Sequence, residues 1–88
     1  MAMDFGEVLE FEKLIKDGQW NEDKGDYAYS QKYYDEAASW YLKATFAYRK
    51  AYDYAYECND YSRQQEAYSR ERTSESKRDD ARNQGWGL

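Results

Sequence analysis

Small residues recur every seven positions along the middle of this chain, and this period limits the possible folds more than any other feature. One row holds Ala37, Ala44, Ala51 and Cys58. A second row with the same spacing is mostly aromatic and holds Tyr33, Trp40, Ala47, Tyr54, Tyr61 and Tyr68. A seven-residue period predicts helices that pack along their length. We therefore expect an all-α protein, a small bundle of three helices or, if the longest helix breaks, of four.

The helix boundaries are predicted from caps and glycines, because the chain contains no proline. Asp4 and Glu7 have the spacing of a capping box, and Gly18 fits a C-terminal cap, so the first helix is expected over about 5–17. A second helix is expected over about 20–32 and a third over about 34–58 or longer. These helices form one domain, residues 1–68. Residues 69–84 hold one alanine and no larger apolar residue, so 69–88 is expected to be a polar helix extension or a flexible tail.

The third helix is expected to be too long for the first two to cover. From residue 34 to about 70 it would be roughly 55 Å long, whereas each of the first two would be about 18–20 Å. The uncovered half would need a second copy, so we expect a homodimer whose interface lies near Tyr54, Cys58 and Tyr61. The alternatives are an ordinary amphipathic core helix, or a break at Asn59–Asp60 with Asp60 or Ser62 capping a fourth helix.

The chain lacks the residues that most enzyme mechanisms need. It has no histidine and one cysteine, Cys58, which excludes imidazole-based catalysis and an intrachain disulfide. Its carboxylates lack the spacing of a calcium loop, and no glycine-rich loop is present to hold phosphate. We expect no enzymatic activity, no metal and no cofactor. Without a disulfide, a signal peptide or an apolar run of about 20 residues, we expect a cytoplasmic protein that does not enter a membrane.

The net charge of −5 is unevenly distributed along the chain. Residues 1–36 hold ten acidic side chains and four lysines. Glu7, Glu10 and Glu12 are expected to form an acidic patch in this part of the chain. Such a patch repels the phosphates of nucleic acid, so we expect no direct nucleic-acid contact, and it suits a basic protein surface. The alternative is a solvated acidic face that keeps the protein soluble.

All eleven tyrosines lie between residues 27 and 68. Burying so many hydroxyl groups would require as many hydrogen-bond partners, so several should stay partly exposed. Tyrosine combines a stiff apolar ring with a polar tip and is enriched in protein interfaces. We expect a protein interface along the helix face that carries Tyr54, Cys58, Tyr61 and Tyr68.

Residues 25–44 resemble a single tetratricopeptide (TPR) repeat. The matching positions are the small and aromatic packing residues of its two helices, namely Gly25, Ala28, Tyr29, the run Tyr34-Asp35-Glu36-Ala37, Trp40 or Tyr41, and Ala44. Small three-helix modules of the MIT kind share the Tyr-Asp-Glu-Ala start. The resemblance implies a helix–turn–helix unit with one open apolar face. Because a single copy cannot cover that face, it must meet the rest of the chain, a second copy or another protein.

Two functions are consistent with these features. The first is a non-catalytic protein–protein interaction module, a small helical adaptor or assembly protein that binds through the tyrosine-rich face. The second is a small acidic inhibitor, of the phage anti-defence, nucleic-acid-mimic or toxin-immunity type, that blocks a basic partner surface. The acidic patch would bind the target in the second case but not in the first.

Overall fold

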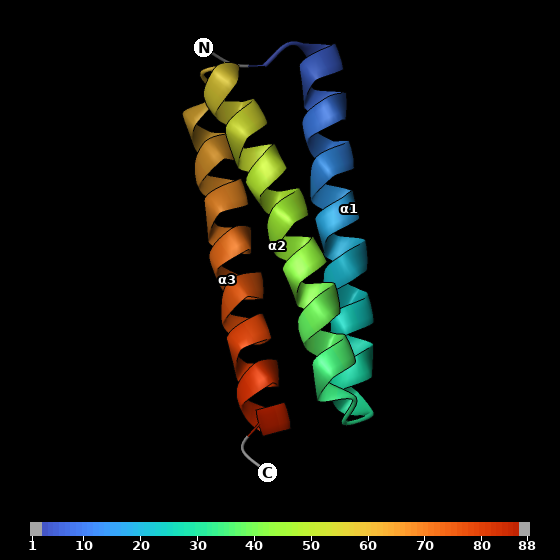
Figure 1. Cartoon of the computed structure of the whole chain (residues 1–88). Coiled ribbons are helices and arrows are strands. Elements are labelled where there is room, and N and C mark those ends of the chain that lie inside the picture. The colour runs from blue at the N-terminus through green and yellow to red at the C-terminus, as the bar shows by residue number, and fades with distance from the viewer. Residues whose placement is uncertain (1–2, 87–88) are drawn as a thin grey trace.

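Three helices of similar length form an elongated antiparallel bundle in the computed structural model, which describes residues 3–86 (Figure 1). Helix α1 spans Phe5–Ser30, α2 spans Tyr34–Glu57 and α3 spans Tyr61–Trp86. Helix α2 packs extensively on both neighbours, whereas α1 and α3 have few direct contacts. About nine-tenths of the described residues are helical and none lies in a strand. This confirms the predicted small all-α bundle of three helices.

Helix α1 is one continuous helix, so the predicted separate helices over 5–17 and 20–32 were wrong. Its start was predicted correctly, because the Asp4 side chain accepts from the Glu7 backbone N–H at 2.8 Å and the Glu7 carboxylate accepts from the Asp4 N–H at 3.0 Å. Gly18 does not end the helix. It is buried in the helix interior and, like every described glycine, has no positive φ.

Gly18 and Gly25 are packing positions rather than caps. A Cβ atom at Gly18 would overlap the ring of Tyr48, and one at Gly25 would lie 2.6 Å from Cδ1 of Tyr41. The missing side chains let both tyrosine rings of α2 lie flat against the backbone of α1. Two glycines seven residues apart therefore set the distance between α1 and α2.

Helix α2 spans Tyr34–Glu57, so the helix predicted over about 34–58 is confirmed, whereas its continuation to about residue 70 is wrong. Asn59 adopts a left-handed conformation with φ of 58°, and Asp60 caps the start of α3. The Asp60 carboxylate accepts from the Arg63 backbone N–H at 3.0 Å and pairs with the Arg63 guanidinium at 2.9 Å. The break at Asn59–Asp60 foreseen as an alternative is therefore present. An equivalent turn joins α1 to α2, where Lys32 has φ of 65°.

We expect Asp60→Ala to lower the free energy of unfolding by about 1 kcal/mol, the usual cost of losing a helix N-cap. The Arg63 backbone N–H, together with the Arg63 side chain and the Met3 N–H, lowers the pKa of Asp60. Because the pKa is lower in the folded state, the ionic part of this stability is present above about pH 4 and is lost as the pH falls through the folded-state pKa. Urea unfolding at pH 7 and pH 3 should therefore show a smaller difference between wild type and variant at the lower pH. An equal difference at both values would contradict the role of the charge, and Asp60→Asn, which keeps a capping oxygen, is the control.

Helix α3 packs closely on α2 through small residues, although its sequence is mostly polar. Ala67, Ser74 and Ala81 are fully buried and recur every seven residues. They face the small residues of α2, and the Ser74 hydroxyl lies 2.6 Å from Oγ1 of Thr45. Residues 69–86 are thus helical, in agreement with the polar helix extension that was one of the two alternatives, but they pack on α2 as part of a separate third helix. Residues 87–88 lie outside the described part.

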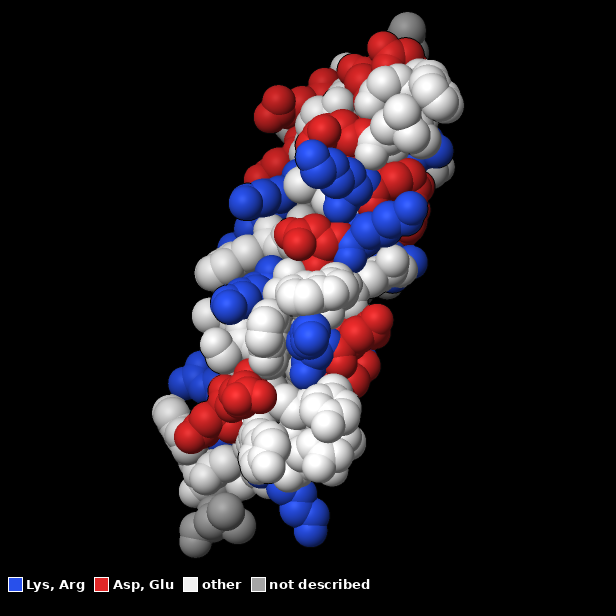
Figure 2. Space-filling model, turned by 90° about the vertical axis from the view of Figure 1, so that its right-hand side faces the viewer, with Lys and Arg blue, Asp and Glu red and all other residues white. Residues whose placement is uncertain are grey.

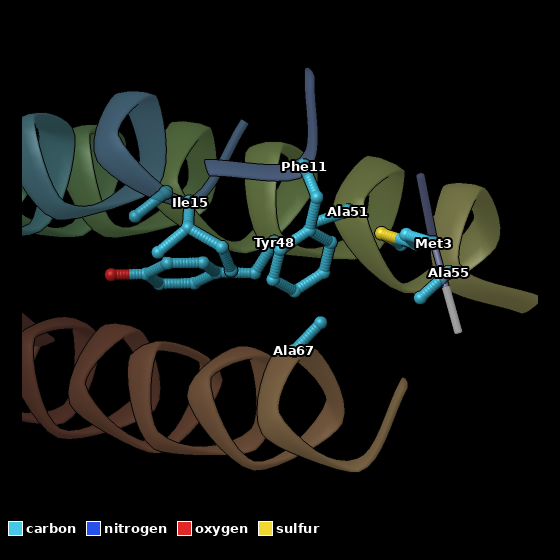
Figure 3. Packing of buried hydrophobic residues seen from close by; sticks show 8 residues of the cluster. Met3, Phe11, Ile15, Tyr48, Ala51, Ala55 and Ala67 are labelled. Carbon is cyan, nitrogen blue, oxygen red and sulfur yellow. The ribbon is translucent and has the colours of Figure 1, made fainter. Parts of the chain in front are cut away.

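The apolar core is built mainly from alanine and aromatic side chains. Figure 3 shows the rings of Phe11 and Tyr48 at the centre of one cluster, with alanines of α2 and α3 around them. A second cluster near the other end of the bundle centres on Tyr41. Because α3 covers α2 along its length, the uncovered helix half that motivated the predicted homodimer interface does not exist in this fold.

Candidate binding surfaces

Neither a metal-binding cluster nor a membrane-spanning helix is found among the described residues. No group of three or more cysteine, aspartate or glutamate side chains within residues 3–86 could hold a metal ion. None of the three helices contains an apolar stretch long enough to cross a bilayer. Two carboxylates of α1, Glu22 and Asp26, instead belong to a structural network.

That network links α1 to α3 across the tyrosines of α2. The Tyr48 hydroxyl donates to Glu22 at 2.6 Å, and the Tyr41 hydroxyl donates to Asp26 at 2.7 Å. The Lys77 ammonium of α3 donates to Glu22 at 2.7 Å and to Asp26 at 3.1 Å. Burial, followed by the hydrogen bond to a carboxylate, raises the pKa of both tyrosines. Burial alone would lower the pKa of Lys77, but its two carboxylate partners raise it. These tyrosines hold the bundle together and are not available to a partner.

The residues of the predicted tyrosine interface do not form one surface. Tyr54 and Cys58 are half-buried and pack on the core, and the Cys58 thiol donates to Glu7 of α1 at 3.4 Å. Burial raises the pKa of that thiol. Tyr61 is exposed at the start of α3. Tyr68 lies between α2 and α3, with its ring centroid 6.0 Å from that of Tyr52.

The residues of the predicted acidic patch point in different directions. Glu7 is half-buried, and its carboxylate accepts hydrogen bonds from the Asp4 backbone N–H and from the Cys58 thiol. At about 100° per residue, Glu10 and Glu12 lie about 160° apart around α1. They therefore cannot present one continuous acidic face, although α1 as a whole carries an excess of acidic residues.

A groove between α2 and α3 combines apolar and cationic side chains. Its volume is about 310 Å³, and it is lined by Asp35, Ala38, Ser39 and Leu42 of α2 and by Arg78, Arg82 and Trp86 of α3. We call these seven residues the arginine groove; Asp35 is its one acidic member. A second concave region of similar size continues from Arg82 and Trp86 around the outer side of α3. Trp86 is 73% exposed, which leaves its indole open to a partner.

The two arginines of the groove are only partly satisfied within the chain. The Arg78 Nε atom is buried and is, among the described residues, without a hydrogen-bond partner. The terminal nitrogen of Arg78 pairs with Asp79 at 3.2 Å. Arg82 forms no ion pair in residues 3–86, and its guanidinium lies 4.9 Å from the Trp86 ring centroid. The Nε atom of Arg78 is enclosed, so the donors that an outside acceptor can reach are those of the exposed Arg82 guanidinium.

Further basic residues extend the groove along the outward side of α2. Lys43 and Lys50 lie about one turn before and after Phe46, whose side chain is 51% exposed. Arg49 pairs with Glu71 of α3 at 2.7 Å and still exposes half of its side chain. This face therefore carries several basic side chains beside an exposed apolar ring, with Asp35 in the groove and Asp53 near Arg49 as acidic neighbours.

Sequence reasoning missed this groove because it treated residues 69–84 as a solvated segment. A usable signal was present, since Arg78, Arg82 and Trp86 recur every four residues and must share one side of a helix. Tyr68, which was predicted as a contact residue, lies five turns before Trp86 and so projects from the same side of α3.

No family model, curated protein or solved structure matches this chain. Residues 25–44 do form a helix–turn–helix, made of the end of α1, the turn and the start of α2. Its relation to the TPR repeat stays a prediction.

Proposed function

We propose that this protein is a non-catalytic protein-binding module that recognises an acidic segment of its partner through the arginine groove. The exposed Arg82 guanidinium, which forms no ion pair within residues 3–86 and lies over the Trp86 ring, is the observation that supports this most. A carboxylate of the partner would accept from Arg82, and charge-assisted hydrogen bonds of this kind are stronger than neutral ones.

The apolar part of the groove supports an anchoring side chain beside that carboxylate. Ala38, Leu42 and Trp86 provide an apolar wall next to the two guanidinium groups. Tryptophan and arginine are the residue types that most often dominate the energetics of protein interfaces. The partner segment is therefore acidic and carries at least one aliphatic or aromatic residue near its acidic group.

The groove replaces the tyrosine-rich face as the proposed contact, because the structure uses many of the tyrosines internally. Tyr41, Tyr48 and Tyr29 each donate to a carboxylate of the same chain. Tyr68 remains available at the far end of the same α3 side, about 27 Å from Trp86. A long partner helix or strand could contact both.

A pull-down from native cell extract, at about 0.15 M and 0.5 M salt, tests this function. Arg78→Glu combined with Arg82→Glu should abolish partner capture, because a partner carboxylate would then meet like charge. Lys32→Glu reverses one charge away from the groove and should leave capture unchanged. Circular dichroism should show that all variants keep their helices, since these side chains are at least partly exposed.

A second set of variants separates this function from the acidic inhibitor. Reversing Glu10 and Glu12 to lysine should leave capture intact if the arginine groove binds the partner. Loss of capture in this variant, with retention in the double arginine variant, would instead support an inhibitor that blocks a basic surface. Binding of the wild type to DNA or RNA at physiological salt would contradict both functions.

A further inference from the structure

Apart from an edge-to-face contact of the Trp20 ring with Trp40 of α2, at 5.7 Å between ring centroids, the outer face of α1 is not covered by the rest of the described chain. Leu9, Trp20 and Tyr27 are 55%, 56% and 68% exposed. At about 100° per residue, these three and the exposed Lys13, Lys16 and Lys24 all lie within about 40° of one line along the helix. Figure 2 faces the α1 side of the molecule and shows apolar, basic and acidic side chains interspersed along it. This unpartnered face has the size and the mixed polarity of a helix–helix contact.

The charged residues before and after Trp20 have the same order when counted outward from Trp20, an acidic residue at three positions and a basic one at four. The segment runs Lys16-Asp17, then Trp20, then Asp23-Lys24. On the helix, Lys16 and Asp23 lie about 40–60° to one side of Trp20, whereas Asp17 and Lys24 lie about 40–60° to the other. None of these four side chains forms an ion pair within residues 3–86. Each side of Trp20 therefore carries one uncompensated positive and one uncompensated negative charge.

An antiparallel second copy would match these charges. A two-fold axis near Trp20 places each side of one α1 against the same side of the other, with the chain direction reversed. Lys16 then lies opposite Asp23 of the second copy, and Asp17 lies opposite Lys24, with offsets along the helix of about 1.5 Å. The axis produces each pair twice, so that four ion pairs surround a contact between two Trp20 side chains.

We infer that the occupant of this face is a second copy of this chain, bound through α1 in an antiparallel two-fold dimer. Such a contact is isologous, with the same patch on both copies. The arginine groove lies between α2 and α3 and stays open in this dimer. The two chains would then present two copies of the proposed binding groove.

The antiparallel orientation is favoured over the parallel one by Lys13. In a parallel pair, Lys13 would face Lys13 of the second copy near the centre of the contact. In the antiparallel pair it faces the exposed ring of Tyr27, seven residues on the other side of Trp20, where an ammonium group is attracted to the ring. An anionic membrane or a nucleic acid is a poorer occupant, because Asp17 and Asp23 would lie against phosphate groups.

Sedimentation equilibrium between about 10 μM and 1 mM measures this association. Because exposed ion pairs contribute little and one helix face is a small interface, we expect a weak dimer with a Kd on the order of 100 μM. Lys16→Glu alone, or Asp23→Lys alone, should raise the Kd at least about tenfold, since two like-charge contacts replace two ion pairs. The double variant should return close to the wild-type Kd, because both members of each pair are reversed.

The control variant is Lys50→Glu, which makes the same charge change on the outward side of α2 and should leave the Kd unchanged. A wild-type protein that is monomeric at about 1 mM would overturn the inference. A double variant whose dimer Kd is as high as that of either single variant would also overturn it. So would a wild-type protein that stays monomeric and binds vesicles of phosphatidylcholine and phosphatidylserine. All these substitutions are at exposed positions, and circular dichroism checks that the helices are kept.

Oxidative cross-linking tests the orientation. In a Cys58→Ser background, Trp20→Cys should form a disulfide-linked dimer under mild oxidation, because position 20 meets its own copy at the axis. Leu9→Cys should not, because antiparallel pairing separates the two copies of position 9 by about 33 Å, far beyond disulfide reach. Efficient cross-linking through position 9 with none through position 20 would contradict the antiparallel dimer.

Discussion

Replacing Ser74 with leucine is expected to detach α3 from α2 and to lower the free energy of unfolding by about 3 kcal/mol or more. Ser74 is fully buried, and its hydroxyl contacts Oγ1 of Thr45 at 2.6 Å. Only alanines occupy the neighbouring positions of this row, Ala67 and Ala81. A leucine has no space there and also leaves the Thr45 hydroxyl without one of its two partners.

Urea unfolding monitored by circular dichroism would measure this effect, and Ser74→Ala is the matched control. Alanine keeps the close approach of the helices, and Thr45 can still donate to the Tyr41 carbonyl at 2.9 Å. The alanine variant should therefore lose only about 1 kcal/mol, the net value of one hydrogen bond. Similar stability of the leucine variant and wild type would mean that α3 does not pack closely on α2.

The close packing of α3 explains why its role was not predicted from the sequence. A buried helix face is normally recognised by large apolar side chains at helical spacing, and residues 69–84 have none. A second row of small residues with the same seven-residue spacing, Ala67, Ser74 and Ala81, nevertheless lies in this part of the chain, two positions out of phase with the row that ends at Cys58. In a close helix–helix contact, a small side chain buries backbone as well as itself, so low hydrophobicity does not indicate exposure.

The small residues of α2 were identified correctly, but their partner was not. Ala37, Ala44 and Ala51 are buried as expected for a row that admits a neighbouring helix. The sequence alone could not tell whether that neighbour came from the same chain. The neighbour comes from the same chain because the backbone turns at Asn59, which adopts a left-handed conformation. The pattern of hydrophobic residues does not report the backbone conformation of a single asparagine.

The candidate groove was beyond sequence reasoning for a similar reason. It needs the beginning of α2 and the end of α3 to lie side by side, and this depends on the position of the turn near Asp60. The charge symmetry around Trp20 is different, because it lies within one helix. It could have been read from the sequence once Gly18 was recognised as an interior residue of α1.

Gly18→Ala is expected to lower the free energy of unfolding by about 1–3 kcal/mol, although alanine is the better helix former. In an exposed helix, this substitution would be stabilising by about 1 kcal/mol. At Gly18, however, a Cβ atom would overlap the Tyr48 ring. That ring cannot move easily, because Tyr48 is fully buried and its hydroxyl is held by Glu22 at 2.6 Å.

Gly6→Ala is the matched control, since it makes the same chemical change in the same helix. A Cβ atom at Gly6 would meet only Oδ1 of Asp4, at an ordinary contact distance of 3.6 Å. Thermal unfolding should therefore show a higher Tm for Gly6→Ala and a lower one for Gly18→Ala. If both substitutions raised the Tm, the Tyr48 ring would not lie against the α1 backbone. Gly18 would then be a replaceable residue rather than the position that sets the distance between α1 and α2.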